Sequence, residues 1–218
     1  MTPDKQRQRM VDEQLRRRNV RDARVLAAFA EIPREEFVLQ SARDHAYGDS
    51  PLSIGEGQTI SQPLVVAMTL ELMQLQGHER VLEIGTGSGY SAALLAVIVR
   101  EVVTIERISS LASAAAARLS RLGYTNVTVY CGDGTLGWPD KAQYEAICVA
   151  AGAPRPPQPL LDQLAIGGRL VLPFGPPDHQ RLVRIIRRSQ VVFDEQDLGE
   201  VRFVPLVGQE GWPESKAP

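Results

Sequence analysis

Residues that bind metals or form cross-links are scarce in this chain, which has 2 cysteines and 3 histidines among 218 residues. Two cysteines are too few for a disulfide framework, so Cys131 and Cys148 are predicted to be buried thiols of a reducing compartment. His45, His78 and His179 lie far apart in the sequence, and none is paired with a cysteine. The spacing of metal ligands is therefore missing, and we predict that the protein binds no metal.

Long apolar runs and a strong excess of one charge are missing as well. The longest apolar run, at residues 92–99, is far too short to span a bilayer, and the polar N-terminus has no secretory pattern. The net charge of −2 argues against a dedicated nucleic-acid binder. We expect a cytoplasmic monomer with neither membrane nor nucleic acid as a partner.

Basic side chains are nevertheless concentrated near the N-terminus. One interpretation is the solvated face of one or two helices, and the other is a patch that attracts an anionic substrate. The residues are Lys5, Arg7, Arg9, Arg16, Arg17, Arg18, Arg21 and Arg24.

The length and composition predict a single globular domain. A chain of 218 residues with 44% hydrophobic residues can build one sizeable core, but hardly two. No repeat or linker divides it. We predict one domain over residues 1–218, with an N-terminal helical substrate region at 1–78 and a cofactor-binding core at 79–218.

The N-terminal third reads as helices around one irregular stretch. Residues 5–18 predict a helix ending near Asn19, and Asp22 can cap a second helix that Pro33 stops. Residues 40–60 show no period and predict a functional or mobile loop. A third helix is expected over 63–76, with Ser61 as its N-cap.

Strands and helices alternate from residue 80 onward. An alternation of this kind predicts an α/β fold with a Rossmann-like, doubly wound, mainly parallel sheet, here with extra N-terminal helices. Two final strands without a helix between them predict an antiparallel pair at one sheet edge. The predicted strands are 80–84, 101–105, 126–130, 146–151, 169–173, 182–187 and 201–206, and the predicted helices are 90–99, 109–122 and 157–165.

The strongest local motif is the glycine turn Gly85-Thr86-Gly87-Ser88-Gly89, which follows a strand and opens a helix. Glycines let the chain turn sharply and let a ligand approach the backbone, where the following helix offers unpaired N–H groups. The next predicted strand is followed by Glu106, at a spacing suited to hydrogen bonds with the ribose hydroxyls of an adenosine. A surface carboxylate is the competing interpretation of Glu106.

The spacing of the glycines favours S-adenosylmethionine over a dinucleotide. A dinucleotide site has the pattern G-x-G-x-x-G, but here Tyr90 stands where its third glycine would be. Glu83, just before the turn, can help to hold the amino group of a methionine tail. Asp133, followed by Gly134, can bond the amino group of adenine, although Asp-Gly pairs are also common in turns.

The glycine turn, Glu106 and Asp133 resemble the class I methyltransferase fold in general, and other segments narrow this resemblance to one family. Residues 46–49 read Ala-Tyr-Gly-Asp, residues 52–55 read Leu-Ser-Ile-Gly, and residues 58–63 read Gln-Thr-Ile-Ser-Gln-Pro. With the glycine block at 82–90 and the segments 159–164, 167–170 and 203–206, they resemble protein-L-isoaspartate (D-aspartate) O-methyltransferases from about residue 10 to residue 210. The resemblance implies methyl transfer from S-adenosylmethionine to the free α-carboxylate of L-isoaspartyl residues in damaged proteins and peptides, with S-adenosylhomocysteine as product.

The resemblance also implies roles for individual residues. Ser61 is the expected active residue, and the tail at 204–207 should help to enclose the substrate. Some family members have a hydroxyl residue where this chain has Val207, so Val207 is left outside the predicted site. The predicted cofactor-binding residues are Glu83, Gly85, Thr86, Gly87, Ser88, Glu106, Arg107, Asp133 and Gly134. The predicted substrate-binding residues are Ile54, Gln58, Thr59, Ile60 and Leu206.

The implied chemistry needs few catalytic groups. A carboxylate acceptor is already ionised near neutral pH, so no general base is required and alignment is the main task. Ser61 could orient the acceptor by its hydroxyl, or it could serve only as a helix cap worth about 1 kcal/mol.

Three alternatives stay open at this point. One is a methyltransferase for another carboxylate, small-molecule or peptide acceptor. A nucleic-acid acceptor is disfavoured, since residues 150–154 offer no aromatic ring for a base to stack on. The others are a nicotinamide oxidoreductase, which the glycine spacing disfavours, and a binding module without catalysis.

Overall fold

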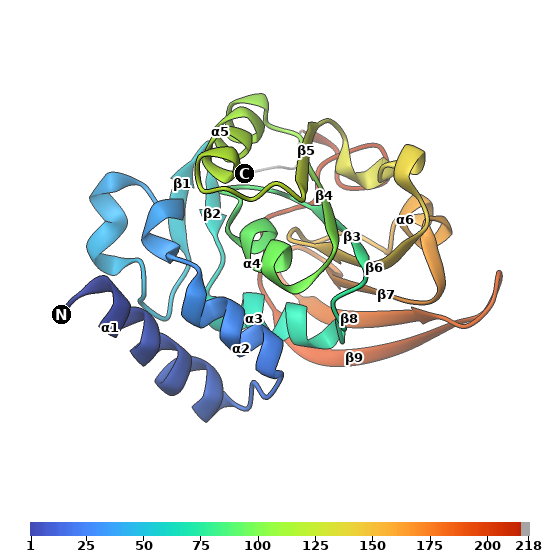
Figure 1. The fold of residues 1–218 in the computed structure, drawn as a ribbon. Coiled ribbons are helices and arrows are strands. Elements are labelled where there is room, and N and C mark those ends of the chain that lie inside the picture. The colour runs from blue at the N-terminus through green and yellow to red at the C-terminus, as the bar shows by residue number, and fades with distance from the viewer. Residues whose placement is uncertain (215–218) are drawn as a thin grey trace.

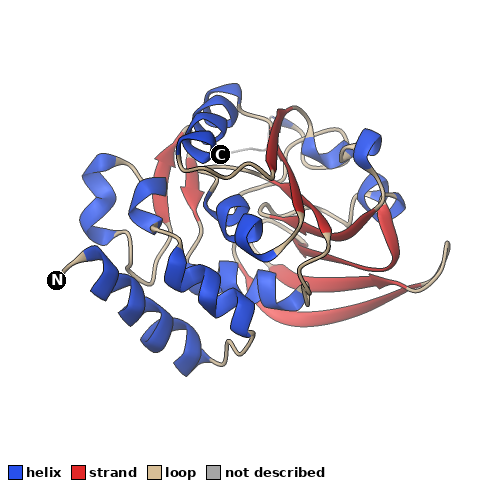
Figure 2. Ribbon diagram, viewed as in Figure 1, coloured by secondary structure: helices blue, strands red, loops and turns tan. Residues whose placement is uncertain are grey.

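A seven-stranded sheet forms the centre of the protein in a computed structural model that describes residues 1–214 (Figures 1 and 2). Its strand order is β5-β4-β3-β6-β7-β8-β9. Neighbours from β5 to β7 are parallel, and β8 and β9 continue the sheet antiparallel, which confirms the predicted fold class. The bounds are β3 Arg80–Ile84, β4 Glu101–Glu106, β5 Val127–Cys131, β6 Tyr144–Val149, β7 Leu164–Phe174, β8 Gln180–Arg187 and β9 Phe193–Val201.

Both faces of the sheet are buried because successive strand side chains point to opposite sides. Val81 and Val102 belong to one hydrophobic cluster together with residues of the N-terminal helices. Their neighbours Leu82 and Val103 belong to a second cluster, which includes Leu160. Covering both faces explains why the central strands read as near-continuous apolar runs.

Helices flank the sheet, and two predicted helix ends are confirmed. Asn19 adopts φ 69° at the end of the first helical segment, and the Asp22 carboxylate accepts hydrogen bonds from the N–H groups of Arg24 and Val25. The α-helices are α1 Pro3–Arg9, α2 Ala23–Glu31, α3 Pro63–Leu72, α4 Tyr90–Ile98, α5 Ser109–Arg121 and α6 Gln158–Asp162. Shorter helical turns are Met10–Leu15, Arg16–Arg18, Arg34–Phe37, Gln40–His45, Gly134–Leu136 and Pro139–Lys141.

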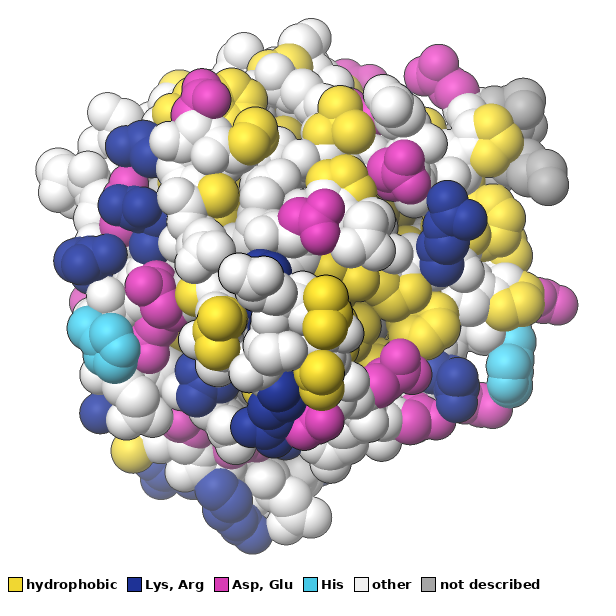
Figure 3. Space-filling model, turned by 90° about the vertical axis from the view of Figure 1, so that its right-hand side faces the viewer, with side chains coloured by type: hydrophobic (Ala, Val, Ile, Leu, Met, Phe, Trp, Pro, Cys, Tyr) yellow, Lys and Arg dark blue, Asp and Glu magenta, His cyan; other side chains and the backbone are white. Residues whose placement is uncertain are grey.

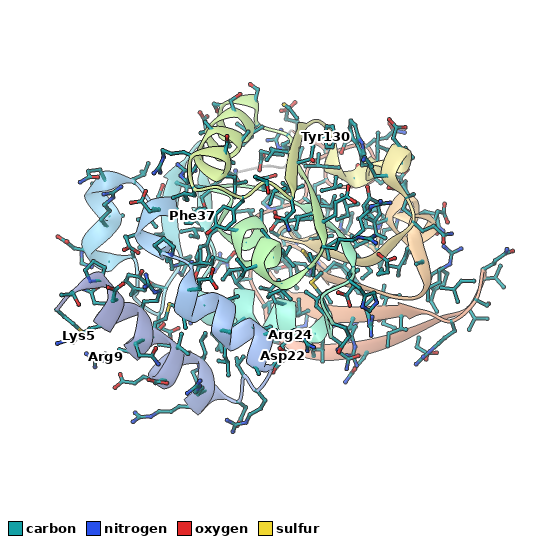
Figure 4. All side chains as sticks on the ribbon, viewed as in Figure 1. Lys5, Arg9, Asp22, Arg24, Phe37 and Tyr130 are labelled. Atoms are coloured by element: carbon teal, nitrogen blue, oxygen red, sulfur yellow. The ribbon has the colours of Figure 1, made fainter. Side chains whose placement is uncertain are left out.

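Much of the N-terminal basic cluster is neutralised locally. Lys5 and Arg9 lie on the outer side of α1 (Figure 4). Figure 3 shows another face, on which acidic and basic side chains are also mixed. Ion pairs join Arg7 to Asp4, Arg9 to Glu13, Arg16 to Asp12, and Arg18 to Asp49. This pairing favours the interpretation of a solvated helix face.

The prediction of a loop over residues 40–60 was wrong. The segment contains the helical turn Gln40–His45 and an antiparallel hairpin of β1, Leu52–Gly55, and β2, Gln58–Ile60. Gly55, Glu56 and Gly57 all have positive φ at the hairpin turn. Strands of three or four residues are too short to show a period, which is why the sequence pattern missed them.

The bounds of the third helix also needed correction. Gln62 is the N-cap of α3 and Pro63 is its first residue, so Ser61 is not the cap that the sequence predicted. The helix ends at Leu72, well before residue 76. The Glu79 carboxylate accepts hydrogen bonds from the N–H groups of Gln76 and Gly77, which holds this backbone outside the helix.

The last strand is β9, Phe193–Val201, and the predicted strand at 201–206 was wrong. β9 is an exposed edge strand with several acidic residues, so it lacks the apolar alternation that identifies a strand. Residues 203–206 instead cross the carboxyl end of β6. The Gly152 N–H donates to the Val204 carbonyl, and the Leu206 N–H donates to the Gly152 carbonyl; each donor–acceptor distance is 2.8 Å.

Two further expectations changed in the C-terminal half. Cys148 is buried as predicted, but Cys131 is exposed, because β5 is an edge strand with a partner on one side only. The helix predicted at 157–165 is shorter in the structure, and the strand predicted at 169–173 is longer. Leu164 is already part of β7, where it pairs with Tyr144 of β6. Within residues 1–214, no helix has the length and apolar character required to cross a membrane.

Leu82→Ala should destabilise the protein strongly, since Leu82 is 0% exposed in the central strand β3. We expect the free energy of unfolding to fall by about 2–5 kcal/mol in urea denaturation, because the cavity leaves packing partners unfilled. Leu39→Ala is the control, with a side chain that is 46% exposed. Equal losses in the two variants would contradict the packing described here.

Candidate functional site

A pocket lies at the carboxyl ends of β3, β4 and β6. Its walls include residues 83–88, 105–108 and 148–151, which end or follow these strands. The hairpin and the link to α3 contribute residues 58–61, and the tail contributes residues 203–207. In open α/β sheets, ligands bind at the point where the strand order reverses, and β3 stands at that point here.

The pocket brings most of the predicted site residues together. Ile54 and Asp133 are the two that do not line it. Ile54 is buried with its side chain beside Gly87, whereas Asp133 borders a neighbouring pocket together with Arg107. The predicted residues that line the main pocket are Gln58, Thr59, Ile60, Ser61, Glu83, Gly85, Thr86, Gly87, Ser88, Glu106, Arg107, Gly134 and Leu206.

The glycine turn has a backbone that other residues would strain. Gly85, Gly87 and Gly89 have φ values of 92°, 54° and 87°. A Cβ at Gly85 would also stand 3.3 Å from the Cβ of Ala150, tighter than ordinary contact. The turn therefore depends on glycine both for its conformation and for its close approach to the loop after β6.

Glu106 joins the turns that follow β3 and β4. It is 6% exposed. Its Oε2 accepts a hydrogen bond of 2.9 Å from the Gly87 N–H, and its Oε1 accepts one of 3.0 Å from the Ile108 N–H. Each carboxylate oxygen keeps a further lone pair. Glu106 can therefore hold the turn in place and still accept hydrogen bonds from a ligand with two hydroxyls.

Glu83 is a buried carboxyl group in the wall of the same pocket. Its Oε2 accepts a hydrogen bond of 2.7 Å from the Thr104 hydroxyl, which is 2.6 Å from the Thr86 hydroxyl. Burial raises the pKa of Glu83 to about 7, against the opposing effect of the Ser91 and Thr104 hydroxyls. A cation in the pocket would favour its ionised form.

Asp133 organises the neighbouring backbone. One oxygen accepts hydrogen bonds from the N–H and the hydroxyl of Thr135, at 2.9 and 2.7 Å. The other accepts a hydrogen bond of 2.7 Å from the Gln209 N–H in the tail. The adenine contact predicted for Asp133 stays a prediction.

Several lining residues were missed by the sequence analysis. Cys148 and Val149 enter the site because β6 pairs with β3, and the order of strands could not be predicted from the sequence. Val207 lines the pocket with an apolar side chain. Other residues that were missed are Val65, Thr69, Tyr90, Ser91 and Phe203.

Ser61 stands where this pocket meets an adjoining groove. Both are lined by Thr59, Ser61 and Val65, and the groove continues along residues 200–205 of the tail. Within residues 1–214 no group of three or more His, Cys, Asp or Glu side chains could hold a metal ion. Because the pocket and the groove meet at Ser61, the arrangement can align two ligands, one on the Glu106 side and one in the groove.

The raised pKa of Glu83 predicts a specific pH dependence of stability. The folded state keeps the proton up to about pH 7, whereas the unfolded chain loses it near pH 4.5, so the contribution is lost as pH rises between these values. The wild type loses this contribution as pH rises and Glu83→Gln does not. The unfolding free energy of Glu83→Gln relative to the wild type should therefore increase by about 3 kcal/mol from pH 5 to pH 8. Urea denaturation at both pH values measures this gain, and parallel pH curves for the two proteins would contradict it.

Comparisons with known proteins agree over nearly the whole chain. Residues 5–211 match the family model for Protein-L-isoaspartate(D-aspartate) O-methyltransferase (PCMT). Protein-L-isoaspartate O-methyltransferase 1 of Rhodopseudomonas palustris (strain HaA2) is 58% identical, over 97% of this chain and 89% of its own. Protein-L-isoaspartate O-methyltransferase 2 of Pelobacter propionicus is 54% identical, over 94% and 92%.

Solved structures show the same fold. A protein-L-isoaspartate O-methyltransferase structure aligns with a TM-score of 0.86 and 31% identity, over 94% of this chain and 67% of that one. A Plasmodium falciparum structure described as a possible member of the family, solved with S-adenosyl-L-homocysteine, aligns with a TM-score of 0.79 and 24% identity, over 91% and 96%. The chain belongs to the protein-L-isoaspartate (D-aspartate) O-methyltransferase family.

Proposed function

We propose that this protein transfers the methyl group of S-adenosylmethionine to the free α-carboxylate of L-isoaspartyl residues in damaged proteins and peptides. One observation carries the proposal. A single pocket is lined both by the glycine turn with Glu106 and by Gln58 to Ser61, which belong to one of the segments that resemble the family. A donor and an acceptor can therefore meet beside Ser61.

The charges of the pocket fit S-adenosylmethionine better than a dinucleotide. Its acidic lining residues are Glu83 and Glu106, and Arg107 is its basic one. Buried carboxylates would repel a pyrophosphate, whereas they attract an amino group and accept hydrogen bonds from ribose hydroxyls. We assign Glu106 to the ribose, Glu83 to the methionine amino group, and the glycine turn to the backbone contacts. S-adenosylmethionine supplies, when bound, a methyl group on a positively charged sulfur.

The protein's own residues have a simple task in this reaction. The acceptor carboxylate is ionised near neutral pH, so no side chain has to remove a proton. The Ser61 hydroxyl makes no hydrogen bond among the described residues, and we assign it to one oxygen of the acceptor carboxylate. Leu206 and Val207 place apolar side chains in the wall and help to exclude water. Alignment of this kind can supply roughly 7–11 kcal/mol of the barrier reduction.

The adjoining groove suits an extended peptide. It runs from Thr59 and Ser61 to residues 200–205, with Glu200 and Arg202 as its charged residues. An extended peptide can be held by main-chain hydrogen bonds that do not depend on its sequence. We propose that the groove receives the residues flanking the isoaspartate, which accounts for a repair enzyme that accepts many damaged proteins.

We further propose that residues 1–78 form a substrate region and residues 79–218 a cofactor-binding core of one domain, with residues 200–205 of the core also lining the acceptor groove. A cytoplasmic monomer that binds neither membrane nor nucleic acid stays a prediction, supported by the free thiols Cys131 and Cys148 and the near-neutral charge. Methylation of another carboxylate is the alternative, since the donor side of the pocket would be the same.

The activity is tested with pure protein, radiolabelled S-adenosylmethionine and two peptides that differ only in Asp or isoAsp at one position. We expect base-labile label on the isoAsp peptide alone, because an ester is formed on its free carboxylate. If the protein binds the donor but labels neither peptide, the proposed acceptor is wrong. Label on the Asp peptide at a similar rate would favour a less selective carboxylate methyltransferase.

Ser61→Ala should lower the rate of transfer and leave donor binding intact. We expect kcat for the isoAsp peptide to fall by about tenfold to a hundredfold, because one positioning hydrogen bond is lost. The dissociation constant of S-adenosylhomocysteine, measured by calorimetry, should stay within about threefold. Ser120→Ala, on an exposed position of α5, is the control and should change neither value. An unchanged kcat in Ser61→Ala would remove the proposed role.

A further inference from the structure

Arg34 is a fully buried arginine beside the acceptor side of the pocket. It lies in the helical turn Arg34–Phe37 and is 0% exposed. Among the described residues, no carboxylate forms an ion pair with it, and burial lowers its pKa from the ordinary value. A buried guanidinium without an ionic partner is costly, so its contacts need an explanation.

The guanidinium binds both ends of the segment that carries the acceptor residues. Its Nε donates to the Ala46 carbonyl, and its Nη2 donates to the Ser61 carbonyl; each donor–acceptor distance is 2.8 Å. Residues 46–61 include the β1–β2 hairpin with Thr59 and Ile60. The rigid geometry of the guanidinium therefore fixes the distance between the two ends of this segment.

Aromatic rings hold Arg34 in place from the other side. The carbon at the centre of its guanidinium lies 4.8 Å from the centroid of the Tyr90 ring, and Tyr90 itself lines the pocket. Phe37, labelled in Figure 4, packs edge-on against Tyr90 with ring centroids 5.4 Å apart. Arg34 is thus placed between a pocket wall on α4 and the Ser61 backbone, and neither can shift without disturbing it.

We propose that Arg34 is a positioning residue that sets the location of the Ser61 segment for methyl transfer. The inference rests on the proposed isoaspartyl methyl transfer and deepens it, by assigning the alignment of the acceptor to a residue outside the pocket. Because Arg34 hydrogen-bonds the acceptor segment and touches the donor side only through the Tyr90 ring, its loss should affect transfer far more than donor binding.

Arg187 offers a matched control for an arginine substitution. It is 8% exposed, its Nη1 donates to the carbonyls of Asp162 and Leu164 at 3.0 and 2.6 Å, and its guanidinium lies 5.8 Å from the ring centroid of Phe193. It resembles Arg34 in burial, in carbonyl contacts and in its aromatic neighbour. The residues that it contacts line no part of the pocket, whereas Ser61 and Tyr90, which Arg34 contacts, do. A lysine at either position keeps the charge and loses the planar geometry.

The experiment compares Arg34→Lys with Arg187→Lys well below their melting temperatures. Both variants should lose thermal stability, as buried arginines do. Arg34→Lys alone should lower kcat for the isoAsp peptide, by about tenfold or more, with binding of S-adenosylhomocysteine within about threefold of wild type. Amide hydrogen exchange in residues 46–61 should be faster in Arg34→Lys and unchanged in Arg187→Lys.

The possible outcomes separate this inference from the proposed function. A wild type that fails to methylate the isoAsp peptide overturns the proposed function, and the exchange experiment still reports on the Arg34 contact. Normal kcat in Arg34→Lys, or equal losses of kcat in both variants, overturns the positioning role. A drop in donor affinity as large as the drop in kcat would also overturn it, since that result indicates general damage to the pocket.

Discussion

The pairing of β3 with β4 on one side and β6 on the other is the constraint on which the site depends. Parallel register aligns Ile84 with Ile105 and Val149, so three strands end at the same edge of the sheet. Their carboxyl ends and the loops that leave them supply the glycine turn, Glu106 and the segment before Gly152. Without this register, residues far apart in the sequence would not form one pocket.

The remaining walls are attached to that edge by a small number of hydrogen bonds. Gly152 bonds the tail at Val204 and Leu206, and the Gln180 side chain bonds both the N–H and the carbonyl of Phe203. On the opposite side, Arg34 fixes the Ser61 segment. The tail and the acceptor segment come from opposite ends of the chain, so neither packs in place by local sequence preference alone.

The sequence predicted what depends on local physics. The strand β3, the glycine turn and the cap at Asp22 follow from short-range rules on apolar runs, φ angles and hydrogen-bond acceptors, and the structure has all three. The turn was assigned to the site by its glycine pattern, whereas residues 58–61 were assigned only because their sequence resembles the family. Both segments line the pocket.

What the sequence could not predict depends on distant contacts. β9 has no apolar alternation because most of its side chains are exposed, and it forms only because β8 is beside it. Cys148 enters the pocket through the order of the strands, and Ser61 loses its predicted cap role because Pro63 starts the helix one residue after Gln62. Nothing near Arg34 in the sequence indicates that it reaches the Ser61 carbonyl.

The distribution of buried charge connects these features to the chemistry. Glu83 and Glu106 stand on the donor side, where a positively charged ligand is expected. Burial raises the pKa of Glu83, since its hydroxyl partners carry no positive charge. Arg34 stands behind Ser61, where an anionic acceptor is expected. A positively charged donor would supply the charge that the Glu83 side of the pocket lacks, and a low-dielectric interior makes such compensation worth more than it is in water. The protein thus bears a desolvation cost at Glu83 before binding, and the donor would offset it beside the place where the methyl group has to be transferred.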